Sequence, residues 1–104
     1  MTKYLLGYHG SFMTEAPAAD DSSMAAWGAW MGGLGKALVD GGNPARAAKT
    51  VAAGGKVSNG GGANPITGYT IIEAASMDDA VALSKGCPIF AAGGSIEVSE
   101  LVAM

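Results

Sequence analysis

The stretch Gly68-Tyr69-Thr70-Ile71-Ile72-Glu73-Ala74-Ala75-Ser76-Met77-Asp78-Asp79-Ala80 decides the fold of this chain. Its first half is rich in β-branched and aromatic residues, which favour a half-buried strand. In its second half, the Ser76 hydroxyl can accept a hydrogen bond from the backbone N–H of Asp79, as the N-cap of a helix does. The carboxylates of Asp78 and Asp79 also suit the positive end of the helix dipole. The stretch therefore predicts a strand that runs straight into a capped helix.

The residues after this helix predict another strand. Gly86 is the expected end of the helix, and Pro88 follows closely. Residues 95–102 then alternate between polar and apolar side chains, which indicates a strand with one buried face. Together these elements make a β-α-β unit over residues 67–102.

The first part of the chain predicts a similar unit. Residues 3–9 form its first strand, residues 12–21 a loop, and residues 37–41 a short second strand. Residues 23–33 form the helix between them, capped by Asp20, Asp21 or Ser22. An apolar stripe runs along this helix at helical spacing; it consists of Met24, Trp27, Met31 and Leu34.

The segment between the two units is rich in glycine. Residues 47–57 have some β character on both sides of Gly54-Gly55, which is the signal of a hairpin with a two-residue turn. Residues 58–65 are predicted to be a loop. Since they lack a G-x-G-x-x-G or G-K-[ST] pattern, they do not predict a phosphate-binding loop.

These elements predict one α+β domain over residues 1–104, a ferredoxin-like βαββαβ sandwich with a hairpin insertion. The expected strand order is 95–102, 3–9, 68–74 and 37–41, all antiparallel, with both helices on one face. The two central strands are apolar on both sides, so the other face needs a cover. We therefore expect a homodimer that buries the open faces against each other.

Composition limits the classes of partner. The chain has 104 residues, a formal net charge of −3 and six Lys and Arg residues, which argues against nucleic acid and against an anionic membrane surface. Its single cysteine, Cys87, can form no intramolecular disulfide and is expected to be a small buried residue. Residues 1–10 do not form a signal peptide, so we expect a cytoplasmic protein.

Candidate catalytic residues gather at one end of the predicted sheet. His9 ends the first strand and is the chain's one side chain that titrates unaided near neutral pH. With Asp40, at the end of the second strand, it could act as a general acid or base. The alternative is that each residue has a structural role. His9 would then be hydrogen-bonded to a backbone carbonyl, and Asp40 would be a turn residue. The glycine-rich loop is expected to cover the same end.

Five further residues are candidates for binding a ligand: Trp30, Asn43, Tyr69, Glu73 and Glu97. Glu73 and Glu97 share the alternation phase of Tyr69, so all three should lie on the open face and could contact a polar ligand. Ion pairs, with Lys3 or with the partner subunit, are the alternative. Trp30 lies off the helix stripe and points either to a pocket or into the core. No spacing of residues predicts a metal site, and no cofactor is expected.

The chain resembles the YCII-related (YciI-like) family over nearly its whole length. The residues that carry the resemblance are Tyr4-Leu5-Leu6-Gly7-Tyr8, the run from Leu34 to Gly42, the run from Gly68 to Ala74, Asp79-Ala80, Cys87-Pro88 and Ile96-Glu97-Val98. The resemblance implies a ferredoxin-like subunit that assembles as a dimeric α/β barrel. Some members of the family eliminate chloride from lactones, and others carry an Asp-Gly-Pro-Phe signature and associate with sigma factors.

Two departures prevent a transfer of those activities. The family's candidate His and Asp on the first helix fall here at Met24 and Gly33, and Asn64-Pro65-Ile66 stands where the signature would be. The expected function is therefore that of a small-molecule-binding homodimer, either a binding protein or an enzyme of acid/base elimination or isomerisation. The alternatives are a non-catalytic dimeric binding or interaction module and, more weakly, a protein that resembles haem-degrading monooxygenases.

Overall fold

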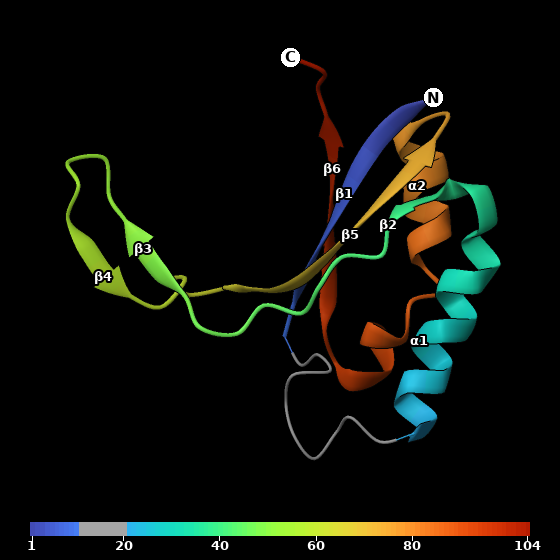
Figure 1. Cartoon of the computed structure of the whole chain (residues 1–104), viewed down its shortest axis with the longest axis horizontal. Coiled ribbons are helices and arrows are strands. Elements are labelled where there is room, and N and C mark those ends of the chain that lie inside the picture. Colours follow the sequence, from blue (N-terminus) through green and yellow to red (C-terminus); the bar gives the residue numbers. More distant parts are fainter. Residues whose placement is uncertain (11–20) are drawn as a thin grey trace.

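The computed structural model describes residues 1–10 and 21–104. One four-stranded antiparallel sheet forms the body, with strand order β2-β5-β1-β6, and two helices lie on one side of it (Figure 1). The elements of this body are β1 (Thr2–His9), α1 (Asp21–Leu34), η1 (Gly35–Ala37), β2 (Leu38–Asp40), β5 (Ile66–Ala74), α2 (Met77–Ser84), η2 (Pro88–Ala92) and β6 (Ser95–Leu101). The predicted strand order is confirmed, and this α+β arrangement is compatible with a ferredoxin-like fold.

The strand-to-helix stretch forms as its residue types predict. The backbone N–H of Asp79 donates to the Ser76 hydroxyl at 3.1 Å, and Asp78 and Asp79 occupy the first turn of α2. This cap starts α2 shortly after β5 ends at Ala74, and the helix runs back across the sheet. In α1, the apolar stripe is confirmed at Trp27 and Leu34, which are buried. The predicted loop after His9 and the Asp20 cap lie outside the described residues.

The core lies between the sheet and the helices because β1 and β5 alternate in register. Leu6 stands opposite Thr70 and Tyr4 opposite Ile72, and all of these side chains are buried. Trp27 of α1 packs edge to face on Tyr8, with ring centroids 5.3 Å apart. The helix face of the sheet therefore carries most of the apolar burial.

The opposite face of the sheet carries the other half of the alternation. Leu5, Tyr69 and Ile71 lie there and are half-buried, and Gly7 separates Leu5 from His9 along β1. Neither helix covers this face (Figure 1). We call it the open face; on its described strands it combines apolar side chains with the carboxylates of Glu73 and Glu97.

The insertion between β2 and β5 differs from its prediction. Lys49–Val51 (β3) and Val57–Asn59 (β4) pair as a hairpin, so residues 58 and 59 are strand rather than loop. The turn is also wider than predicted: Gly55 N–H donates to the Ala52 carbonyl, and Ala52 N–H donates to that of Lys56. Gly55 has φ 91°, which completes a type I turn with a bulge.

The hairpin stands away from the body instead of covering the sheet end (Figure 1). We call residues 45–65 the arm. The radius of gyration is 14.6 Å, against about 13 Å for a compact chain of this size. The expectation that the glycine-rich segment covers the His9 end is therefore wrong for most of its length. The last residue of the arm, Pro65, contacts His9 through its carbonyl oxygen.

Candidate functional site

His9 is held at the end of β1 between two oxygens. Its Nδ1 lies 3.1 Å from the Pro65 carbonyl oxygen, and its Nε2 lies 3.5 Å from Oε1 of Glu97. The side chain of His9 is 10% exposed, whereas that of Glu97 is 70% exposed. The imidazole is therefore nearly buried, whereas the carboxylate beside it is exposed to solvent.

The strand register brings His9 and Glu97 together. Glu97 of β6 stands opposite Gly7, and His9 stands opposite Ser95, so His9 and Glu97 are diagonal neighbours on the open face. A bulge between Tyr8 and His9 shifts the pairing with β5 and places His9 opposite Ile66, next to Pro65. Because Gly7 has no side chain, nothing separates the imidazole from the carboxylate.

The two contacts define what the imidazole can do. A carbonyl oxygen only accepts, so Nδ1 of His9 carries a proton and donates to Pro65. In the neutral ring, Nε2 then carries a lone pair that is directed toward Glu97. In the protonated ring, Nε2 carries a proton and is a second donor. One proton can therefore pass between Nε2, the carboxylate and a third group that reaches Glu97 from solvent. This is the geometry of an acid/base pair.

Asp40 does not belong to this pair. It stands opposite Ile71 on β5 whereas His9 stands opposite Ile66, and five residues of strand span roughly 17 Å. Its Oδ1 accepts instead from the backbone N–H of Gly42 at 2.8 Å. The structure thus supports the alternative role of Asp40 as a turn residue. The carboxylate beside His9 is that of Glu97 and not that of Asp40.

The other predicted ligand residues do not converge on one point. Asn43 holds Tyr69 through its backbone, since its carbonyl accepts from the Tyr69 N–H at 3.3 Å. Tyr69 stands opposite Gly7 on the open face, beside the acid/base pair. Glu73 shares that face but stands opposite Lys3, roughly 14 Å along β1 from the row of Glu97. The two carboxylates therefore do not act together within one chain.

Trp30 connects the two helices. Its indole N–H donates to the Leu83 carbonyl of α2 at 3.1 Å, and its ring lies edge to face on Trp27 at 5.9 Å. A Cβ on Gly86 would approach the Trp30 ring to 3.3 Å, so Gly86 allows the close contact. The structure therefore gives Trp30 a packing role, which agrees with the alternative that this side chain points into the core.

A buried polar chain escaped the sequence analysis. The Tyr8 hydroxyl donates to Thr70 Oγ1 at 2.7 Å, and the Thr70 hydroxyl donates to the Gly41 carbonyl at 3.1 Å. It joins β1, β5 and the end of β2 beneath the open face. No local motif announces it, because the two side chains are far apart in sequence and meet only through strand register.

Cys87 lies beside the buried polar chain of Tyr8 and Thr70 and is itself buried, as expected. Burial raises the pKa of its thiol from 9.0 to about 11, opposed by hydrogen bonds with the Ile89 backbone and with the Tyr8 side chain. Burial also raises the pKa of Tyr8, against the opposing effect of its bond to Thr70. Both groups are therefore neutral in the folded protein up to alkaline pH, and Cys87 is a poor nucleophile.

These shifts predict a loss of stability in alkali. The folded pKa of Cys87 lies above its unfolded value, so its contribution is complete below pH 9.0 and is lost as the pH rises toward about 11. The slope reaches at most about 1.4 kcal/mol per pH unit. Urea titrations followed by tryptophan fluorescence should show a steeper decline between these pH values for the native protein than for Cys87→Ala. Equal slopes would contradict the burial of an ionisable thiol.

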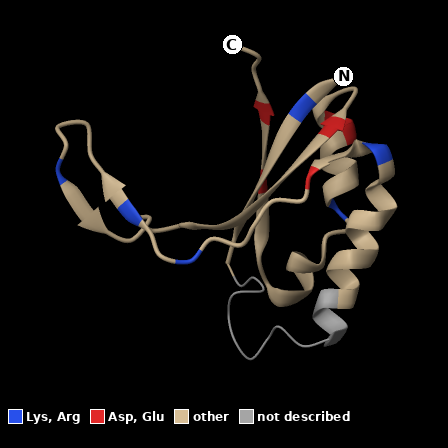
Figure 2. Cartoon of the chain, viewed as in Figure 1, with Lys and Arg blue, Asp and Glu red and all other residues tan. Residues whose placement is uncertain are grey.

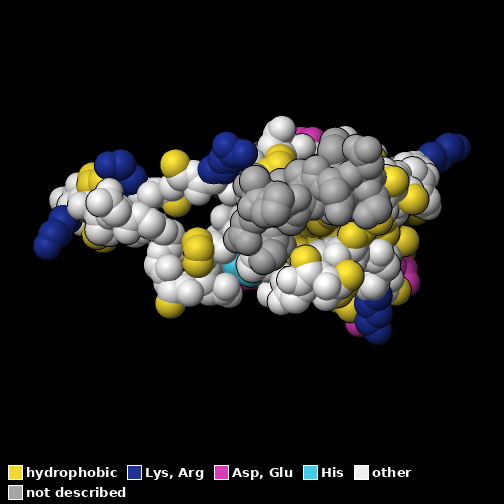
Figure 3. All heavy atoms as spheres, turned by 90° about the horizontal axis from the view of Figure 1, so that it is seen from below, with side chains coloured by type: hydrophobic (Ala, Val, Ile, Leu, Met, Phe, Trp, Pro, Cys, Tyr) yellow, Lys and Arg dark blue, Asp and Glu magenta, His cyan; other side chains and the backbone are white. Residues whose placement is uncertain are grey.

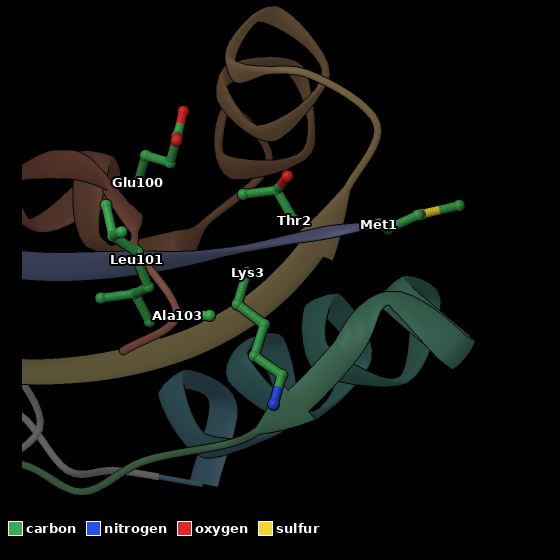
Figure 4. Close-up of a pocket in the computed structure, with 7 residues that line it drawn as sticks. Met1, Thr2, Lys3, Glu100, Leu101 and Ala103 are labelled. Atoms are coloured by element: carbon green, nitrogen blue, oxygen red, sulfur yellow. The ribbon is translucent and has the colours of Figure 1, made fainter.

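Two open hollows lie away from the acid/base pair. One, of about 500 Å³, is formed where the first residues of β1 meet the last of β6 (Figure 4). Thr2 and Glu100 point there toward the side of α2, and Lys3 points to the other side. The other, of about 660 Å³, lies between η1, the end of β5 and α2, and Lys36 and Glu73 are among its lining residues. Neither His9 nor Glu97 is among the residues that line these two hollows.

Metal and membrane sites find no support in the described residues. Within residues 1–10 and 21–104, no three His, Cys, Asp or Glu side chains are grouped as metal ligands. None of the helices in this part of the chain is long and apolar enough to cross a bilayer. In comparisons with known proteins, the chain matches no family model, no curated protein and no solved structure.

Proposed function

We propose that this protein is a small-molecule-binding homodimer that carries out acid/base chemistry, elimination or isomerisation, at the pair of His9 and Glu97. The observation that carries the proposal is the pair itself, with Nδ1 bonded to the Pro65 carbonyl at 3.1 Å and Nε2 3.5 Å from the carboxylate. A general base needs an oriented ring with a lone pair directed at the site, and these contacts supply both.

The second copy completes the site in this proposal. The open face is partly apolar, with Leu5, Tyr69 and Ile71 half-buried, and a large uncovered apolar face favours association. When two such faces pack together, Tyr69 and the acid/base pair become the wall of an enclosed space. This assembly is the dimeric α/β barrel that the resemblance to the YCII-related family implies, and membership of that family is part of the proposal.

A non-catalytic dimeric module is the second candidate, and one observation favours it. The imidazole of His9 is only 10% exposed and its Nδ1 is satisfied by backbone, as in a structural histidine. A role in haem degradation is not proposed, because both ring nitrogens of His9 already face protein oxygens.

The first test is the state of association. Sedimentation equilibrium at micromolar concentration is expected to give twice the mass of the 10.3 kDa chain. We expect a dimer whose two open faces pack together to have a dissociation constant at or below about 1 μM, as interfaces of standard size commonly do. A single stable subunit at this concentration would contradict the homodimer and leave the acid/base pair without an enclosure.

The second test uses a probe of base strength. The ring opening of 5-nitrobenzisoxazole breaks a C–H and an N–O bond and yields a coloured phenolate, so it reports a positioned base without knowledge of the natural substrate. We expect the native protein to accelerate this reaction, and His9→Gln to reduce the acceleration by about 10²-fold or more. Glu73→Gln is the matched control, since it removes a carboxylate from the same face that does not contact His9. Equal rates for the native protein and His9→Gln would favour the non-catalytic module.

A further inference from the structure

Two segments of this chain carry charges of a single sign. The arm contains Arg46, Lys49 and Lys56 and no acidic residue, although the whole chain has a net charge of −3. The strand β6 contains Glu97 and Glu100 and no basic residue. Figure 2 shows basic residues along the arm, whereas basic and acidic residues are mixed on the body. A charge division of this kind favours contact between an arm and a β6 strand.

The arm does not make that contact within its own copy. Among the described residues, the ion pair found is that of His9 with Glu97, so neither Lys49 nor Lys56 is paired with a described carboxylate of its own copy. Figure 3 shows the arm running away from the body with basic and hydrophobic side chains along it. Val51 is 67% exposed and Val57 54%. Because an isolated hairpin in water is at best marginally stable, the arm needs a surface to rest on.

The strand β6 is suited to receive it. Among the described strands it forms one edge of the sheet, pairing with β1 on one side and with none of them on the other. Edge strands commonly carry charge, which prevents two identical edges from pairing. Two acidic β6 edges repel each other, but a basic strand is attracted to either of them. The acidic edge therefore discriminates in favour of a basic arm.

Size also permits the contact. The arm extends roughly 25 Å if residues 45–52, which precede its turn, are extended, and a four-stranded sheet is about 19 Å wide. The arm leaves the body on the side away from the helices (Figure 1), so in a homodimer with the open faces together it extends on the side of the partner. It can therefore pass the partner's sheet and reach the partner's outer strand.

We propose that, in the homodimer, the arm of each copy lies along β6 of the other, with Lys49 and Lys56 paired with Glu97 and Glu100 there. The inference rests on the proposed homodimer and goes beyond it, because it assigns the arm a partner and brings a cation of one copy beside the acid/base pair of the other. The occupant is a second copy of this chain, since the complementary charges belong to the same sequence.

Charge reversal tests this contact. Variant one is Glu97→Lys with Glu100→Lys, which makes the edge basic, and variant two is Lys49→Glu with Lys56→Glu, which makes the arm acidic. Each variant alone is expected to raise the dimer dissociation constant at least about tenfold at low salt, since attraction becomes repulsion at both arms. Mixing the two variants should restore the native affinity, because every arm in the mixed dimer then meets an edge of opposite charge.

The control and the readouts separate this inference from the proposed homodimer. Lys36→Glu with Lys85→Glu makes the same change of net charge as variant two, at exposed residues of the body, and should leave the dissociation constant unchanged. Fluorescence anisotropy of one labelled copy measures association, and circular dichroism verifies folding. A native dimer whose affinity is the same in variant two and in the control would overturn the arm contact and leave the homodimer intact. A native protein that is monomeric would overturn both.

Discussion

Replacing Gly42 by alanine is expected to destabilise the protein by at least about 3 kcal/mol, more than any other glycine substitution near the sheet. Gly42 has φ 73°, a left-handed conformation, and a Cβ built on it would overlap the backbone carbonyl of Tyr69. Conformational strain alone costs about 1–2 kcal/mol. The remainder arises because the backbone must move apart where the Asn43 carbonyl accepts from the Tyr69 N–H.

Gly35 provides the matched control for this prediction. It also has a positive φ, 56°, but a Cβ there would meet nothing within 4 Å. Gly35→Ala therefore measures the cost of the left-handed backbone without the overlap, about 1–2 kcal/mol. Urea unfolding followed by tryptophan fluorescence compares the two. Similar losses for both variants would show that the corner between β2 and β5 yields easily, and would weaken the account of how Tyr69 is positioned on the open face.

The second large effect is expected at Tyr8. Its side chain is fully buried, packs on Trp27 and begins the polar chain to Thr70. Tyr8→Ala should cost about 3–5 kcal/mol, because it removes a buried ring and leaves a cavity between the sheet and α1. Tyr8→Phe keeps the ring and should cost only about 1 kcal/mol, since it removes the hydrogen bond to Thr70 and the weaker one with the Cys87 thiol.

The comparison of these two variants identifies the source of stability. If packing dominates, Tyr8→Phe retains most of the stability that Tyr8→Ala loses, and the ratio of the two costs is at least about three. Thermal unfolding by calorimetry measures both. A Tyr8→Phe loss as large as that of Tyr8→Ala would instead place the stability in the hydrogen-bonded chain from Tyr8 through Thr70 to Gly41.

Local signals predicted the elements that local physics controls. The Ser76 cap, the strand that precedes it and the buried Cys87 all follow from residue types within a few positions of one another. The order of the strands also followed, because two β-α-β units have few ways to share one sheet. The turn of the arm was predicted less well, since the positive φ of Gly55 suits a two-residue or a three-residue loop equally.

The candidate site was only partly predictable for a different reason. Residue type and alternation indicate His9, Tyr69 and Glu97 one at a time, and the structure brings His9 and Glu97 together. Asp40 was paired with His9 because both end strands at the same side of the sheet. Strand ends do not fix the register, and the register separates the two by several residues of β5.

The sequence by itself determined that this chain forms an α+β domain with one sheet, two helices on one side and an apolar second face. Periodicity and capping carry that information, since they depend on neighbours along the chain. Only the tertiary structure decided which carboxylate faces His9, that Pro65 orients the imidazole, and that a basic arm stands apart from an acidic edge strand. These are contacts between residues far apart in sequence, and they depend on register, on a bulge and on the direction in which the arm leaves the sheet, none of which is set by local residue types.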